Sequence, residues 1–208
     1  MVKGTRVLMG DEAEELTTAL ETMRQYLLVR GYREVIIPSL WEQQTFVDKA
    51  GKEILNQMYA FNDKGDRPIC LIPEVTAIIQ QLYKDSWSRS LPKPVKVFYS
   101  SRCYRYEQPQ AGRYREFNQF GVELLGGKAP GDADEVKQIL MDLLSEFTID
   151  YTFSDIVKRG LDYYIEDGFE ASCAKLGAQK QIAGGGRYET GIGFAIGVDR
   201  MLLARKQQ

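Results

Sequence analysis

The side chains best suited to binding chemistry gather in two expected strands, residues 95–107 and 114–125, which a polar turn at residues 108–113 connects. Side chains alternate between the two faces of a strand. Odd positions share one face and include an arginine, two carboxylates and an amide: Arg105, Glu107, Gln119 and Glu123. Even positions share the other face and are aromatic or aliphatic: Phe98, Tyr104, Tyr106, Phe120, Val122 and Leu124. One face of this hairpin can therefore pack on a core, while the other is free to bind.

The polar face of the hairpin has two interpretations. A sheet face that simply meets solvent would also be polar. That interpretation does not account for the scarcity of lysine and threonine, or for so many groups that form fixed, directional hydrogen bonds. We therefore favour a binding face.

Size and composition are those of an ordinary globular domain. The chain has 208 residues, of which 44% are apolar and 27% are charged. Its net charge of −2 provides no overall attraction to nucleic acid. We expect a single domain with its own hydrophobic core.

The absence of histidine limits the chemistry. It excludes a histidine general base, a Ser-His-Asp triad and any histidine-ligated metal. Cys70, Cys103 and Cys173 are far apart and form no C-x-x-C pair, so we expect buried thiols in a reducing cytosol and no zinc site or disulfide. The N-terminus lacks an apolar signal region and no stretch is long enough to span a bilayer, which predicts a cytoplasmic protein.

Two amphipathic helices are expected. The first covers residues 11–31, with Asp11 and Glu14 as its cap and Gly31 as a left-handed end. The second begins at Asp132. Their apolar stripes comprise Leu16, Leu20, Met23 and Leu27 in the first helix and Val136, Ile139, Leu140, Leu143 and Leu144 in the second.

Short strands and turns account for most of the remaining chain. Strands are expected at residues 35–38, 58–61, 69–72, 149–153, 168–171 and 179–183, and from residue 191 into a last helix. Residues 86–96 form a polar linker, and residues 184–186 form a glycine-rich turn that lacks the Lys-Ser/Thr of a P-loop. Glu74 lies in the first turn of another helix, where the dipole favours a carboxylate. Arg200 lies in the first turn of the last helix, where a cation opposes the dipole and a bound anion would explain it.

Several strings in this sequence resemble one family. Residues 105–119, of the form R-x-E-x-P-Q-x-G-R-Y-R-x-F-x-Q, resemble motif 2 of the class II aminoacyl-tRNA synthetases, and the histidyl member in particular. The string RGLDYY at residues 159–164 resembles the signature of histidyl-tRNA synthetases and their histidine-binding paralogues. GGRY at residues 185–188 and the segment 191–200 resemble a histidyl-family string and motif 3. The first helix and strand resemble motif 1.

This resemblance implies a fold and a reaction. The fold is α+β, an antiparallel β-sheet flanked by helices, in one catalytic domain over residues 1–208. The reaction joins histidine to AMP from ATP, with Mg²⁺ on the phosphates. Motif 1 implies a homodimer. Transfer of histidine to tRNA is also implied, although it would be weak without an anticodon-binding domain.

The resemblance also implies which residues act. ATP would be bound by Arg105, Glu107, Arg113, Phe117 and Arg200. The amino acid would be bound by Glu74, Thr76, Gln119, Glu123, Arg159, Tyr163, Tyr164 and Tyr188. Arg105, Arg159 and Arg200 would be catalytic, because guanidinium groups neutralise phosphate charge and a carboxylate nucleophile needs no general base. No metal held by the protein is implied, since Arg159 would stand where other class II enzymes use a metal ion.

The sequence departs from the family pattern in several places. Val75 replaces the glycine of a P-E-G-T string, and we expect it to narrow the mouth of the pocket. Residues 165–167 replace the usual Thr-Gly at the rim of the amino-acid pocket. The family's insertion before RGLDYY and its C-terminal anticodon-binding domain have no counterpart, so we expect a catalytic core only.

Three functions remain open on the sequence. The first is an enzyme that makes histidyl-adenylate. The second is a silent histidine sensor, similar to the regulatory subunit of ATP phosphoribosyltransferase, which typically loses the arginines and glutamate of motifs 2 and 3. The third is an adenylating enzyme that loads a protein or peptide instead of tRNA. Retention of Arg105, Glu107, Arg113 and Arg200 favours the enzyme over the sensor.

Overall fold

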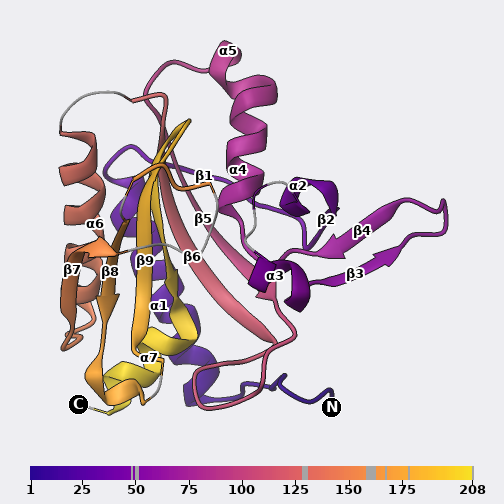
Figure 1. Ribbon diagram of the computed structural model, residues 1–208. Helices are drawn as coiled ribbons and strands as arrows, with labels where there is room; N and C mark the ends of the chain where they lie inside the picture. Colours follow the sequence, from indigo (N-terminus) through magenta and orange to yellow (C-terminus); the bar gives the residue numbers. More distant parts are fainter. Residues whose placement is uncertain are drawn as a thin grey trace.

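A seven-stranded sheet forms the centre of the protein. The computed structural model describes residues 1–47, 49, 52–127, 131–157, 163–166, 168–177 and 179–207. From edge to edge the strands are β1 (Arg33–Glu34), β5 (Val95–Tyr104), β6 (Glu116–Leu125), β10 (Gly191–Gly197), β9 (Gln181–Tyr188), β8 (Gly168–Ser172) and β7 (Thr152–Val157) (Figure 1). β1 runs parallel to β5, and the other described neighbours are antiparallel. A largely antiparallel sheet flanked by helices confirms the expected α+β fold.

Three helices contribute to the larger hydrophobic core, on one face of this sheet. They are α1 (Asp11–Leu28), α6 (Asp132–Glu146) and α7 (Val198–Lys206). Even positions of β6 point toward them, as the alternation predicts, and are fully buried: Phe120, Val122 and Leu124. Among the described helices, none is long and apolar enough to cross a membrane.

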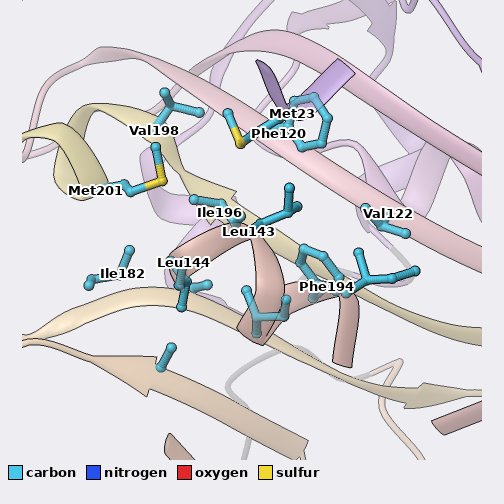
Figure 2. Packing of buried hydrophobic residues seen from close by; sticks show 14 of the residues in the cluster. Met23, Phe120, Val122, Leu143, Leu144, Ile182, Phe194, Ile196, Val198 and Met201 are labelled. Atoms are coloured by element: carbon cyan, nitrogen blue, oxygen red, sulfur yellow. The ribbon is translucent and has the colours of Figure 1, made fainter. Parts of the chain in front are cut away.

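Figure 2 shows the interior of this core. Met23 of α1 and Leu143 and Leu144 of α6 lie with the sheet residues Phe120 and Phe194 in a single apolar cluster. Phe98 and Phe120 stack with ring centroids 5.7 Å apart. Burial of these side chains supplies most of the free energy that holds the helices on the sheet.

The opposite face carries a second core and a smaller sheet. The smaller sheet consists of β2 (Leu40–Glu42), β4 (Pro68–Leu71) and β3 (Tyr59–Asn62), and projects from the body of the protein (Figure 1). The helical segments on this side are α2 (Gln44–Val47), α3 (Lys52–Gln57), α4 (Thr76–Leu82), a π-helical turn (Tyr83–Trp87) and α5 (Ser88–Ser90). The second core joins Ile78 and Ile79 of α4 to Val97, Tyr99 and Cys103 of β5. β5 therefore contributes to both cores, through Phe98 on one face and through Val97, Tyr99 and Cys103 on the other.

The predicted helices are confirmed, although α1 ends at Leu28 and, of its predicted stripe, Met23 and Leu27 are buried while Leu16 and Leu20 are only partly buried. Gly31 follows α1 with φ of +78°, the left-handed end expected for it. All five stripe residues of α6 are buried. The prediction that Asp11 caps this helix is wrong. Gly10 is the N-cap of α1, and no side-chain hydrogen bond caps the helix. Asp11 and Glu14 lie inside the first turn instead, where their charge favours the helix dipole.

Some segments outside the hairpin differ from the sequence-based expectation. β1 ends before residues 35–38, since only Val35 continues its pairing, through a bond from its N–H to the carbonyl of Phe98 at 2.9 Å. The strand expected at 149–153 begins at residue 152, because Ile149 is packed in the core beneath α6. The linker expected at 86–96 contains helical turns, because Trp87 and Leu91 pack on the second core.

The glycines at residues 184–186 lie within β9 and not in a turn. A β-carbon on Gly185 would stand 2.3 Å from the carbonyl oxygen of Gly193 and 2.6 Å from the ring of Phe169. The close approach of neighbouring strands therefore requires glycine here, rather than a change of chain direction.

We expect the large core to dominate stability. Leu143 is fully buried between α6 and the sheet, so Leu143→Ala should lower the free energy of unfolding by about 2–5 kcal/mol. Val7→Ala is the control, since Val7 is 80% exposed and its loss should change stability by less than about 0.5 kcal/mol. Urea denaturation followed by circular dichroism measures both. Equal effects of the two substitutions would contradict this account of the core.

Candidate functional site

A cleft of about 400 Å³ opens on the face of the sheet opposite α1 and α6. Residues of β6, β9 and β10 line it, together with the starts of α4 and α7 and the loop at residues 105–115. Most of the residues predicted from the sequence lie in its wall: Glu74, Thr76, Arg105, Glu107, Arg113, Phe117, Gln119, Tyr163, Tyr164 and Arg200. The structure thus brings together the two groups of residues that the sequence assigned to ATP and to an amino acid.

Arg105 leaves β5 at the point where the chain enters the cleft loop. Its Nε donates a hydrogen bond to the carbonyl oxygen of Pro73 at 2.9 Å. Its guanidinium carbon lies 5.3 Å from the centre of the Phe117 ring. Both contacts orient the side chain, and neither neutralises its charge.

Arg200 is held in the same way by uncharged acceptors. Its Nε donates to the carbonyl oxygen of Gly112 at 3.0 Å, and its Nη1 to that of Gln181 at 2.9 Å. Its Nη2 donates to the side-chain oxygen of Gln179 at 2.5 Å. Burial and the nearby charge of Arg113 lower the pKa of Arg200 from its ordinary value. Arginine nevertheless remains protonated in proteins, so the cleft contains a fixed cation.

The loop between β5 and β6 is folded around Glu107. The Nε of Arg113 lies 2.6 Å from Oε2 of Glu107, and the Nε of Arg115 donates to the Glu107 carbonyl oxygen at 3.0 Å. Gly112 has φ of +71°, a conformation that glycine adopts without strain. β5 therefore ends earlier than predicted, at Tyr104, and β6 begins later, at Glu116, and the loop turns Arg113 into the cleft.

Thr76 is the first residue of α4, and Glu74 lies two residues before it rather than in the first turn as predicted. The backbone N–H of Ala77 donates to Oε1 of Glu74 at 2.9 Å, and the hydroxyl of Tyr163 lies 3.5 Å from Oε2. Glu74 is only 2% exposed, and burial raises its pKa despite the helix N–H and the charge of Arg105. One oxygen of Glu74 is therefore held by the helix, while the other faces the tyrosine in the cleft.

Glu123 lies beneath the floor of the cleft. It is fully buried, and it accepts hydrogen bonds from the hydroxyls of Thr76 at 2.6 Å and Tyr188 at 2.5 Å. Burial raises the pKa of Glu123 to about 8, against the opposing effect of these two hydroxyls. Gly193 makes room for it, because a β-carbon there would stand 1.7 Å from Oε2 of Glu123. Glu123 and Tyr188 are not themselves part of the described wall, but Glu123 bonds to Thr76, which is.

Sequence reasoning missed several residues that line the cleft. They are Ile54, Gln57, Gly112, Tyr114, Glu170, Gln179, Gln181, Ile182, Gly184, Ala195, Gly197 and Asp199. Alternation along the strand expected at residues 179–183 would have indicated Gln179 and Gln181, and adjacency to Arg200 would have indicated Asp199. Arg159 lies outside the described residues, so its predicted role is untested.

Val75 does not narrow the pocket mouth, contrary to the sequence-based expectation. Its side chain is fully buried in the second core and is not part of the cleft wall. The N-terminal residue of a short helix can point either way, and here the apolar side chain is drawn inward. The second departure from the family pattern is at residues 165–167. There Ile165 is 60% exposed, and Asp167 lies outside the described residues.

Comparison with known proteins agrees with this geometry. A sequence profile of the family described as histidyl-tRNA synthetase matches residues 4–159. The chain belongs to the histidyl-tRNA synthetase family. A histidine–tRNA ligase of Archaeoglobus fulgidus is 29% identical over 307 aligned positions, which cover 97% of this chain and 75% of that protein. One from Methanospirillum hungatei JF-1 is 30% identical, with coverage of 97% and 74%.

Solved structures give the same result for the fold. The crystal structure of S. aureus histidyl-tRNA synthetase superposes with a TM-score of 0.83 at 26% identity, covering all of this chain and 70% of that one. Pyrrolysyl-tRNA synthetase from Desulfitobacterium hafniense has the same fold, with a TM-score of 0.74 at 17% identity. The alignment of 307 positions exceeds the 208 residues of this chain, so the Archaeoglobus relative has residues without a counterpart here.

The buried glutamate predicts a pH dependence of stability. Because burial holds the pKa of Glu123 at about 8, above its ordinary value of 4.5, the folded protein keeps a proton that the unfolded chain releases. This contribution to stability is complete below the unfolded pKa and is lost as the pH rises through the folded pKa. Glu123→Gln should therefore flatten the fall in unfolding free energy over this range, by at most about 1.4 kcal/mol per pH unit.

Urea denaturation across that pH range measures the difference. Glu189→Gln is the control, since Glu189 is exposed and pairing with Lys84 lowers its pKa. That carboxylate loses its contribution only as the pH falls below its ordinary pKa, so the control should keep the wild-type slope. An unchanged slope in Glu123→Gln would show that the buried carboxyl does not bind the proton.

Proposed function

We propose that this protein activates histidine by joining it to AMP from ATP. The observation that supports this best is the convergence of Arg105, Arg113 and Arg200 on one cleft that also holds Glu74 and Thr76. A triphosphate requires fixed cations, and an amino acid requires an acceptor for its ammonium group. Residues 1–208 would form the catalytic domain.

The reaction needs position and charge neutralisation more than acid–base catalysis. An oxygen of the amino-acid carboxylate attacks the α-phosphorus of ATP, the bond from that phosphorus to the bridging oxygen breaks, and pyrophosphate leaves with the electron pair. The nucleophile is already ionised at neutral pH, so the lack of histidine in the chain is no obstacle. Arg105 would stabilise the charge on the α-phosphate, while Arg113 and Arg200 would hold the γ-phosphate end.

Mg²⁺ would enter with ATP. Mg²⁺ is usually held by one or two carboxylates together with substrate phosphates. Among the described residues no group of three or more acidic or cysteine side chains could hold a metal ion alone. Glu107 lines the cleft beside Arg113 and fits the role of a single carboxylate partner. When bound, the ion would add positive charge at the phosphates.

The amino-acid end of the cleft fits a substrate with several hydrogen-bonding groups. Glu74 would take the ammonium group, with Thr76 beside it, and Gln119 would lie near the carboxylate. Tyr163 and Tyr164 in the cleft wall would contact the imidazole ring, with Glu123 and Tyr188 in the layer behind them. A buried site of this kind rejects an apolar analogue strongly, because the polar groups would be left unpaired.

A histidine-binding regulatory subunit is the second candidate. A solved structure described as an ATP phosphoribosyltransferase regulatory subunit/histidyl-tRNA synthetase from Bacillus halodurans C superposes with a TM-score of 0.82, covering 97% of this chain and 81% of that one. At 16% identity this supports the fold alone. The arginines in the cleft favour the enzyme, because a protein that only senses an amino acid has no use for them. Loading of an acceptor other than tRNA would use the same first step.

Amino-acid-dependent exchange of pyrophosphate into ATP, measured with each of the twenty amino acids, tests the proposal. We expect exchange with histidine. Arg105→Ala should reduce its rate by at least about 100-fold, as expected when one oxyanion-stabilising donor is lost. Arg102→Ala is the matched control, because Arg102 lies on the same strand but is 66% exposed and pairs with Glu116 outside the cleft. Binding of histidine without exchange would instead support the regulatory subunit.

We further propose a cytoplasmic homodimer that binds histidine, ATP and, with low efficiency, tRNA. The segment expected at the dimer interface presents unusually exposed apolar side chains, with Val29 78% and Ile36 87% exposed. Sedimentation should show a dimer, and Ile36→Asp should shift it toward monomer, because a charge would be buried without a partner. Val2→Asp, at a position 66% exposed in the N-terminal segment, is the control. A monomeric wild-type protein would contradict the proposal.

A further inference from the structure

The N-terminal segment, residues 1–10, docks on the loop that carries Arg113 (Figure 1). The backbone N–H of Arg115 donates to the carbonyl oxygen of Gly4 at 2.8 Å. Gly4 has φ of +84°, and a β-carbon there would lie 2.8 Å from Cγ of Arg115 and 3.0 Å from Cγ of Pro109. The segment therefore lies directly against both sides of the loop, and the close approach needs glycine.

Arg6 connects this segment to two residues that line the cleft. Its guanidinium carbon stands 3.9 Å from the centre of the Tyr114 ring, and its Nη2 forms an ion pair with Oδ1 of Asp199. Tyr114 lies between Arg113 and Arg115 in the loop, while Asp199 directly precedes Arg200 in α7. A single guanidinium group thus contacts the neighbours of two of the three cleft arginines.

Asp199 is itself tied to the sheet. The backbone N–H of Asn118 in β6 donates to its Oδ2 at 2.6 Å, and the Asn118 side-chain amide lies 3.3 Å from Oδ1. The Asp199 side chain is only 4% exposed, whereas that of Arg6 is 32% exposed. Arg6, Asp199 and Asn118 therefore link the loop, the strand and the last helix into one network.

If the cleft is to bind a nucleotide, the negative charge of Asp199 must be neutralised by a nearby cation. A carboxylate in the wall of a cleft would repel the phosphates of a nucleotide unless it were neutralised. Arg6 supplies that cation from outside the cleft, since it is not among the residues of the wall. The same side chain also lies over the Tyr114 ring, and a guanidinium is suited to such a contact in a way that an ammonium group is not.

We propose that Arg6 is a positioning residue for the nucleotide half of the site. It sets the place of the Arg113 loop and of Arg200 and neutralises Asp199, without touching the substrate. This inference rests on the proposed function in naming ATP as the ligand. The amino-acid half has its own supports, in α4 and in the Thr76–Glu123–Tyr188 hydrogen bonds, so it should not depend on Arg6.

The test is steady-state pyrophosphate exchange with Arg6→Gln in the full chain. We expect the KM for ATP to rise roughly tenfold or more, because a misplaced binding group costs affinity steeply, while the KM for the amino acid changes less than about twofold. Arg6→Lys should restore the neutralisation of Asp199 but not the stacking on Tyr114, and should give an intermediate KM for ATP. A protein that had merely lost part of its folded fraction would instead show a lower kcat with both KM values unchanged.

Lys3→Gln is the matched control, since Lys3 is an exposed cation on the same segment. Limited trypsin digestion gives a readout independent of activity: cleavage after Arg113 and Arg115, followed by mass spectrometry, should be faster in Arg6→Gln than in the wild type and in Lys3→Gln. An unchanged KM for ATP together with unchanged cleavage, or an equal change in Lys3→Gln, would overturn the inference. Absence of exchange in the wild-type protein would overturn the proposed function instead, and the digestion would still decide the role of Arg6 in the loop.

Discussion

Cations that are to hold a triphosphate must be fixed by groups that do not neutralise them. Arg105 and Arg200 meet this condition, since the hydrogen bonds that they donate to other described residues go to carbonyl or amide oxygens. Each such bond orients the guanidinium and leaves its charge for a ligand. Arg113 is the exception, because it pairs with Glu107 in the folded loop. The loop, the start of α7 and the N-terminal segment are arranged around this requirement.

The other end of the cleft faces the opposite difficulty, since it must contain carboxyl groups away from water. Full burial of a charged carboxylate is costly, and the protein reduces that cost by holding Glu123 protonated near neutral pH. Thr76 and Tyr188 supply hydrogen bonds to both of its oxygens. Glu74 instead receives a hydrogen bond from the backbone N–H of Ala77 in the first turn of α4. One cleft therefore presents charge beside Arg105, Arg113 and Arg200, and a hydrogen-bonded network beneath Thr76.

Much of this could be predicted from the sequence because it follows from local pattern. The alternation from residue 95 to residue 125 placed Phe120 in the core and Gln119 at the cleft, as the structure confirms. The buried apolar stripe of α6 could also be predicted, because an amphipathic helix buries residues at a regular spacing. The position of Gln119, Glu74 and Arg200 in one cleft was implied only by the resemblance, because no local pattern reports which distant segments meet.

What escaped prediction depends on contacts between segments far apart in the chain. The glycines of β9 were predicted to form a turn. Instead, Gly193 and Phe169 of the neighbouring strands come so close to residue 185 that only glycine fits there. Val75 was predicted to lie at the mouth of the pocket, but its side chain packs in the second core. The N-terminal residues carry no periodic signal at all, so nothing in the sequence indicated that Arg6 would meet Asp199, which lies 193 positions away.

The register of β6 places both the side chains of the core and the side chains of the cleft. Gln119 and Glu123 alternate along β6 with Phe120, Val122 and Leu124, so the register that buries the apolar set also presents the polar one. A slip of one residue would exchange the two sets and destroy core and cleft together. The ladder with β10 fixes this register and places Gly193 opposite Glu123, where only a glycine leaves room for the carboxyl group. The core therefore does more than stabilise the fold, because its packing sets the positions from which the cleft residues act.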